Sequence, residues 1–339
     1  MKRFFPVLMA VLCAFLALMI ASSSSFLYAT NFWTDTNIYF TIGRGMTQGL
    51  MPYRDLFDHK GPLLFVLYAL GACISKTGFI GVFMLEVASL AAALYAGWRT
   101  VCLYGEGQLT LLAMPLTATA ACCCTAFTQG GSAEEFCLPA LVLGVALTLA
   151  LLKNRTAHPK AAQMLFGAAA GWVFLIKYTD CGLFAGLGLC LLLGLMVQQG
   201  WLAALGAAVR MLAGAMLVCL PTAGYLAANG VLKDWIDVYF IQNLFDYSGT
   251  PMSLTGHLYN ALAYLRTQSL VNPALALAAG AGMLFIAADA IRTRERGFWA
   301  LALAVPMGAG LLLLTCYWGE MAHPYYALVF AALVPVGPM

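Results

Sequence analysis

Apolar stretches of about 20 residues recur from one end of this 339-residue chain to the other, and a helix of that length matches the hydrocarbon thickness of a bilayer. Hydrophobic residues make up 63% of the chain and charged residues 9%, against about 45–50% and about 25% in soluble domains. The sequence therefore predicts a single all-α domain over residues 1–339, a polytopic transmembrane helical bundle. About ten spans are expected, near residues 5–27, 79–98, 109–127, 136–152, 163–179, 182–198, 204–228, 271–289, 298–316 and 325–338.

A shorter apolar stretch, residues 61–75, decides the sidedness of every later loop. It is short for a crossing and begins with Gly61-Pro62, so we expect a membrane-surface or re-entrant helix. Ten basic residues at the ends of the spans then share one face, which the positive-inside rule makes cytoplasmic. They are Lys2, Arg3, Arg99, Lys153, Arg155, Lys160, Arg210, Arg292, Arg294 and Arg296. We expect a multi-pass protein of the inner (plasma) membrane with a cytoplasmic N-terminus and an uncleaved first span.

Most acidic residues then fall on or near the extracytoplasmic face. Two long segments on that face, residues 28–60 and 229–270, alternate aromatic with polar residues, as suits the headgroup layer. We expect them to form short amphipathic helices that lie on the membrane and roof a cavity. The outer acids are Asp35, Asp55, Asp58, Glu134, Glu135, Asp180, Asp234, Asp237, Asp246 and Glu320.

The first long segment concentrates groups that could carry chemistry. Asp35 follows the first span, and Pro52-Tyr-Arg-Asp-Leu-Phe-Asp-His-Lys-Gly-Pro62 precedes the short apolar stretch. A solvated loop whose charges pair with one another is the simpler interpretation. The aromatic residues of the segment argue against it, as does the apolar sequence beside its charges, because an unpaired charge there is costly and tends to be functional.

These motifs resemble the first outer loop of the GT-C membrane glycosyltransferases, and most closely the bacterial branch of glycosyltransferase family 39, which includes protein O-mannosyltransferases and lipid A aminoarabinose transferases. The resemblance rests on Asp35-Thr-Asn-Ile-Tyr39, Gly45-Met-Thr-Gln-Gly49, Pro52-Tyr53-Arg54-Asp55 and His59-Lys60-Gly61-Pro62-Leu63. Gly61 departs from the family pattern, which often has proline there. Elsewhere the chain matches in architecture, with acids at Gly130-Gly-Ser-Ala-Glu134-Glu135, a lysine at Lys177-Tyr178 and a late His-Tyr element from Tyr317 to Tyr326.

The resemblance implies transfer of a sugar from a polyprenyl-phosphate donor to an envelope lipid, glycan or protein on the extracytoplasmic face. Asp35 is the expected general base, and Asp55 and Asp58 are further catalytic candidates. The expected residues around the substrate and the donor phosphate are Tyr53, Arg54, His59, Lys60, Glu134, Glu135, Lys177 and His323. The implied chemistry requires no cofactor. A divalent metal stays an open alternative, because the carboxylates would suit a hard cation.

Other functions remain to be separated from this one. A transporter or flippase of an amphipathic or glycolipid substrate would also need many spans and a polar cavity, although no internal repeat is evident. A scaffold subunit or a degenerate transferase is a third reading. The net charge of +3 gives no support for a nucleic-acid partner. Relatives often continue beyond the position of Met339, so we expect either a short form or a chain truncated at its C-terminus.

Overall fold

The structure, a computed structural model, describes residues 4–246, 252–318 and 323–337. Regular structure in these ranges is helical, apart from one isolated bridge between Pro52 and Leu56. The all-α prediction is therefore confirmed for the described part of the chain. Three predicted features, the basic residues Lys2 and Arg3 and the acid Glu320, lie outside the described residues.

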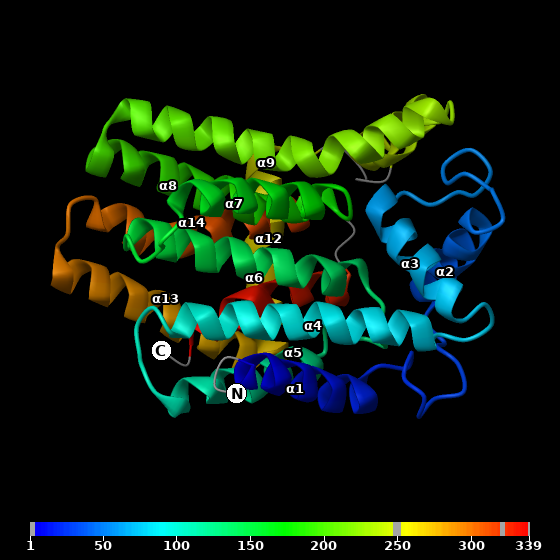
Figure 1. The fold of residues 1–339 in the computed structure, drawn as a ribbon, viewed down its shortest axis with the longest axis horizontal. Coiled ribbons are helices and arrows are strands. Elements are labelled where there is room, and N and C mark those ends of the chain that lie inside the picture. The colour runs from blue at the N-terminus through cyan, green and yellow to red at the C-terminus, as the bar shows by residue number, and fades with distance from the viewer. Residues whose placement is uncertain (1–3, 247–251, 319–322, 338–339) are drawn as a thin grey trace.

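Long helices lie side by side and make up most of the molecule (Figure 1). Helices or short helical pairs occupy all ten of the stretches predicted as spans. They are α1 (Phe5–Ala21), α4 (Ile80–Val101), η1 (Gln108–Leu112) with α5 (Ala113–Cys122), α6 (Ala133–Leu152), α7 (Pro159–Phe174), η2 (Tyr178–Cys181) with α8 (Gly182–Gln199), α9 (Trp201–Ala228), α13 (Pro273–Thr293), α14 (Phe298–Cys316) and η4 (Pro324–Val336).

Six helical stretches are long and apolar enough to cross a membrane, which supports a multi-pass protein. They are 80–101, 133–152, 178–199, 201–228, 273–293 and 298–316. Four apolar helices are shorter, among them α1 and α3 (Pro62–Ile74). The 13 residues of α3 measure about 20 Å, less than the hydrocarbon core of about 30 Å. The count of ten spans stays a prediction.

Two short helices, α2 (Thr34–Met46) and α3, sit across one end of the bundle (Figure 1). They pack closely because α2 presents a glycine at their contact. A Cβ on Gly43 would lie 2.5 Å from the carbonyl carbon of Tyr68, so no larger residue fits there without movement. This contact fixes α2, and with it Asp35, against the helix that follows Lys60.

The opposite end of the bundle collects basic residues. Lys153, just after α6, forms an ion pair with Asp289 of α13 at 2.7 Å. Arg210 of α9 donates a hydrogen bond to Gln163 of α7 at 2.6 Å. Among the described residues, Arg99, Lys153 and Arg292 of the predicted set lie at or near the ends of α4, α6 and α13, while the placement of this end in the cytoplasm stays a prediction.

The second long segment, residues 229–270, was expected to form short helices, and only its first part does so. It contains α10 (Leu232–Ile236), η3 (Asp237–Gln242) and α11 (Asn243–Phe245), and then the 18-residue helix α12 (Leu254–Val271). The aromatic residues of η3 pack on the end of α7, where Tyr239 donates a hydrogen bond to the Phe174 carbonyl at 2.6 Å. The part of the segment from α10 to α11 therefore lies at the end of the bundle that carries α2 and α3.

Candidate functional site

Asp35 lies in the first turn of α2, where a carboxylate is favoured by the helix dipole. Two tyrosine hydroxyls donate to its Oδ2 atom, Tyr325 at 3.0 Å and Tyr39 at 3.5 Å. Its Oδ1 atom has no hydrogen bond among the described residues, and the residue is partly exposed. Asp35 is therefore held in position through one oxygen while the other can meet a ligand.

The loop before α3 is joined to the end of α7 by backbone hydrogen bonds. Gly61 N donates to the Ile176 carbonyl at 2.9 Å, and Leu63 N donates to the Leu175 carbonyl at 3.0 Å. A Cβ on Gly61 would lie 2.1 Å from the Leu175 oxygen, and a proline would also remove the N–H donor. The glycine that departs from the family pattern is therefore what allows these two segments to touch.

Lys60 precedes that contact and is buried, with 7% of its surface exposed. The phenol of Tyr53, whose backbone has φ of +73°, donates to the Lys60 carbonyl at 2.8 Å. The Lys60 Nζ atom is 3.4 Å from His59 Nε2, and no carboxylate of the described residues lies within ion-pair distance of it. Burial lowers the pKa of Lys60, and the positive charge of Lys177 lowers it further.

His59 is held as a neutral ring at physiological pH. Burial is the main cause, and the nearby charges of Lys60 and Lys177 add to it, so that the pKa of His59 falls to about 3. Its carbonyl accepts a hydrogen bond from Asn243 at 2.9 Å, which ties the loop to the second long segment. A neutral imidazole beside an ammonium group can exchange a proton or accept a hydrogen bond.

Glu134 lies in the first turn of α6, which is preceded by two glycines with left-handed backbone. Gly130 and Gly131 both have φ of +83°, a conformation that costs glycine little. Ser132 then caps the helix by accepting from Glu135 N at 3.1 Å, and the Glu135 side chain accepts from Ser132 N at 2.9 Å. Glu135, predicted to contact substrate, therefore serves as a helix cap, and its neighbour Glu134 faces Lys177.

The buried side chain of Glu86 packs against the turn at Gly130 and Gly131. The Ser22 hydroxyl, at the end of α1, lies 3.0 Å and 3.1 Å from the two carboxylate oxygens of Glu86 in α4. A Cβ on Gly130 would lie 2.6 Å from Glu86 Oε1, so the carboxyl group fills the space under the turn. Glu86 therefore packs directly against the turn that leads into α6.

Lys177 is the centre of a buried ion-pair group at the end of α7. Its Nζ atom lies 2.5 Å from Glu134 Oε1 and 3.7 Å from Asp180 Oδ1, and 3.6 Å from the ring centre of Tyr326. The two carboxylates offset the cost of burying this ammonium group. Two buried oxygens, Glu134 Oε2 and Asp180 Oδ2, have no hydrogen-bond partner among the described residues. Cys316 also contacts Asp180, with its Sγ atom 3.3 Å from Oδ1.

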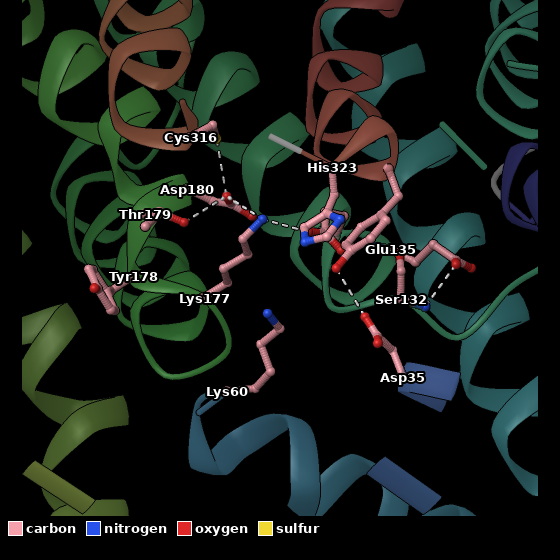
Figure 2. Close-up of polar contacts among 12 residues, drawn as sticks. Asp35, Lys60, Ser132, Glu135, Lys177, Tyr178, Thr179, Asp180, Cys316 and His323 are labelled. Carbon is pink, nitrogen blue, oxygen red and sulfur yellow. Dashed lines mark hydrogen bonds and ion pairs between the residues drawn. The ribbon is translucent and has the colours of Figure 1, made fainter. Parts of the chain in front are cut away.

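His323 lies at the start of η4, where its ring stacks on Tyr325 at a centroid distance of 5.2 Å. Its carbonyl accepts a hydrogen bond from Tyr264 of α12 at 2.6 Å. Figure 2 shows Asp35, Lys60, Lys177 and His323 grouped around one region, each from a different part of the chain. We call these four residues, with Glu134, the polar centre.

The structure separates some of the other predicted site residues from the polar centre. Arg54 and Asp55 form a two-point ion pair with both bonds at 2.9 Å, and 48% of the Arg54 side chain is exposed. The guanidinium of Arg54 is the main reason that the pKa of Asp55 falls to about 2. Asp58 accepts from Lys60 N at 2.9 Å, and burial raises the pKa of its carboxyl group. Asp55 thus has a local partner at the surface, whereas Asp58 supports the backbone of Lys60.

Sequence reasoning did not assign Asp180, Tyr325 or Cys316 to the site. Asp180 follows Lys177 by three residues, a spacing that puts two side chains on one helical face, and this signal was present in the sequence. Tyr325 belongs to the same element as His323. Nothing in the sequence pairs Cys316 with Asp180, because the two lie 136 positions apart.

No three His, Cys, Asp or Glu side chains of the described ranges converge as metal ligands. The carboxylates that could have formed such a set have separate partners. Asp55 pairs with Arg54, Glu134 pairs with Lys177, and Asp35 accepts from tyrosines. This arrangement does not fit a preformed metal site, and we derive no step through a metal.

Comparisons with known proteins bear on the fold. No family model matches the sequence, and no match was found among curated proteins. Among solved structures, the chain is similar to the crystal structure of the Archaeoglobus fulgidus oligosaccharyltransferase in complex with Zn and sulfate. The TM-score is 0.54 at 16% identity, and the match covers 98% of this chain and 48% of the other, so this chain spans about half the length of that protein. The chain thus has a helical fold similar to that of a solved oligosaccharyltransferase.

Proposed function

We propose that this chain is a membrane glycosyltransferase of the GT-C class that moves a sugar from a polyprenyl-phosphate donor to a cell-envelope acceptor on the extracytoplasmic face. The observation that carries the proposal is Lys60, a buried cation without a carboxylate partner among the described residues, which Figure 2 shows in one region with Asp35, whose Oδ1 atom has no hydrogen bond there. Burying an unpaired ammonium group is costly unless a ligand of opposite charge pairs with it. The phosphate group of a donor would be such a ligand.

The fold of the solved neighbour supports the same class. That protein is an oligosaccharyltransferase, which is a transferase of sugars, and it was solved with sulfate, an oxyanion of similar shape to phosphate. The apolar helices around the polar centre suit a donor with a polyprenyl tail, because the tail can stay in the bilayer while its phosphate reaches Lys60. Membership of family 39 rests on the sequence motifs of the first long segment.

The proposed reaction needs one base and one group that stabilises the leaving phosphate. Asp35 Oδ1 accepts the proton of an acceptor hydroxyl, and the oxygen of that hydroxyl attacks the anomeric carbon of the sugar. The bond from that carbon to the phosphate oxygen breaks, and the electron pair leaves with the phosphate. Lys60 offsets the charge that develops there. Because no side chain attacks the sugar, the reaction inverts the anomeric centre.

Purified protein incubated with a panel of polyprenyl-phosphate sugars and a cell-envelope extract that supplies acceptor hydroxyls tests the proposal. The wild type should release polyprenyl phosphate with one of them, and Asp35→Asn should lose about 10²- to 10⁴-fold of that rate. Asp246→Asn removes an exposed acid of the second long segment and is the matched control, expected to keep the rate.

Two outcomes would count against the enzyme. Turnover unchanged by Asp35→Asn removes Asp35 as the base. Movement of the intact lipid across the membrane of vesicles that contain the protein, without cleavage of the sugar–phosphate bond, would instead favour the hypothesis of a transporter or flippase.

A further inference from the structure

A second concave feature lies on the flank of the bundle, away from the polar centre. It is a groove of about 790 Å³ between α4, α6 and α7, within the range of about 300–1,000 Å³ typical of ligand pockets. It is lined mainly by apolar side chains. We call it the flank groove.

The sequence explains why the flank groove exists. Its lining positions recur with helical spacing, so that each helix contributes one stripe. The stripe of α6 includes Ala140, Ala146 and Ala150, and that of α4 includes Ala92 and Ala96. Alanine fills little space between neighbouring helices, so these stripes leave a trough whose sides are formed by larger residues, Tyr95, Leu143, Leu147, Leu165 and Trp172 among them.

The length of the flank groove matches one leaflet of a bilayer. Along α6 it runs from Pro139 to Ala150, which is about 16 Å at about 1.5 Å per residue. Half of a hydrocarbon core is about 15 Å thick. The groove therefore has the length of an acyl chain that starts at one membrane surface and ends near the midplane.

One end of the flank groove is basic. Arg99, Arg155 and His158 line it where α4 and α6 end, and no acidic residue is among the lining residues. Neither arginine has an ion-pair partner in the described ranges. Lys153 nearby differs, because Asp289 neutralises it at 2.7 Å. The uncompensated positive charge of the groove thus sits where a lipid headgroup would lie.

We propose that the flank groove binds an anionic glycerophospholipid of the bilayer, with its headgroup phosphate at Arg99 and Arg155 and an acyl chain along α6. The proposed donor of the glycosyltransferase would not fit here. Its phosphate belongs at the polar centre by the start of α6, whereas the basic end of the groove lies by the end of that 20-residue helix, about 30 Å away. The site is independent of the proposed catalytic function.

Lipid binding to the purified protein in detergent tests this proposal, counted by native mass spectrometry. The probes are phosphatidylglycerol and phosphatidylcholine with identical acyl chains, and phosphatidylglycerol should bind more tightly. Each arginine near a headgroup contributes about fivefold, so Arg99→Gln with Arg155→Gln should weaken phosphatidylglycerol about 30-fold. Arg294→Gln with Arg296→Gln removes the same charge from the exposed turn after α13 and should have little effect.

A steric variant tests the groove itself. Ala92 is exposed and lines the groove, so Ala92→Phe should block the acyl chain and reduce binding at least tenfold. Ala88→Phe, on the same helix but outside the groove, is its control and should bind as the wild type does. Equal binding of both lipids, full binding by the double arginine variant, full binding by Ala92→Phe, or preferential binding of a polyprenyl phosphate would each overturn the proposal.

Discussion

Replacing each of the two buried lysines by methionine should change stability in opposite directions. Methionine has a similar length and no charge, so the comparison isolates the ammonium group. Lys177 has two carboxylates within 3.7 Å, while Lys60 has none at ion-pair distance among the described residues. Lys177→Met therefore breaks an ion pair, whereas Lys60→Met removes the free-energy cost of burying an unpaired charge.

The expected sizes follow from this difference. Lys177→Met leaves Glu134 and Asp180 buried and unpaired, with 1% and 0% of their side chains exposed. Removing one partner of a buried pair costs about 3–5 kcal/mol. Lys60→Met removes a desolvated cation, and replacing buried charges by apolar groups of similar volume is often stabilising by about 1–4 kcal/mol. Activity should fall in both, by about 10²- to 10³-fold for Lys60→Met if it stabilises the leaving phosphate.

Thermal unfolding in detergent, followed by the reaction of buried cysteines such as Cys137 with a fluorescent thiol reagent, measures the difference. The Tm should rise in Lys60→Met and fall in Lys177→Met. A pH series adds an independent check. Because the folded pKa of Lys60 lies below the usual 10.5, the unfolded chain binds more protons between the two values. Wild-type stability should therefore gain from this group as pH rises through that window, and Lys60→Met should lack the gain.

One result would refute this reasoning. If Lys60→Met loses as much stability as Lys177→Met, then Lys60 is paired within the protein, and the argument that it awaits a phosphate fails.

The remaining predictions concern the loop contact and the topology. Gly61→Ala places a Cβ 2.1 Å from the Leu175 oxygen and should lower the free energy of unfolding by about 1–3 kcal/mol, as measured by thermal unfolding. Gly224→Ala, in open space within α9, is the control and should be neutral or slightly stabilising. Equal effects of the two substitutions would contradict the close approach at Gly61. Gln48→Cys and Ala157→Cys, both at exposed positions, should react with a membrane-impermeant thiol reagent from opposite sides, with Ala157→Cys on the cytoplasmic side, in a background without other exposed cysteines. Labelling of both from the same side would refute the predicted topology.

The helical class could be predicted from sequence because it depends on a repeated, local property. Runs of apolar residues determine where helices can lie in a bilayer, and helices occupy the stretches predicted. The number of crossings stays a prediction, since it depends on the length and tilt of each helix in the bilayer. The 3-10 helix η4 and the short α3 show that an apolar stretch need not form a full-length α-helix.

The polar centre was predictable only in part. Asp35, Lys60, Glu134, Lys177 and His323 were all singled out from motifs, and the structure brings them to one end of the bundle. Which charges pair could not be predicted, because pairing depends on contacts between distant segments. Lys177 meets Glu134 across 43 positions, and Asp35 meets Tyr325 across 290.

The backbone bonds from Gly61 and Leu63 to the end of α7 have a consequence for how a ligand would bind. Two lysines that repel each other are kept as neighbours by peptide groups, so the pair exists before any anion arrives. The binding site for a phosphate would therefore be preorganised, and little binding free energy would be spent on ordering the chain. In a hydrogen-exchange experiment, the amides of Gly61 and Leu63 should therefore be as slow with the site empty as with it filled.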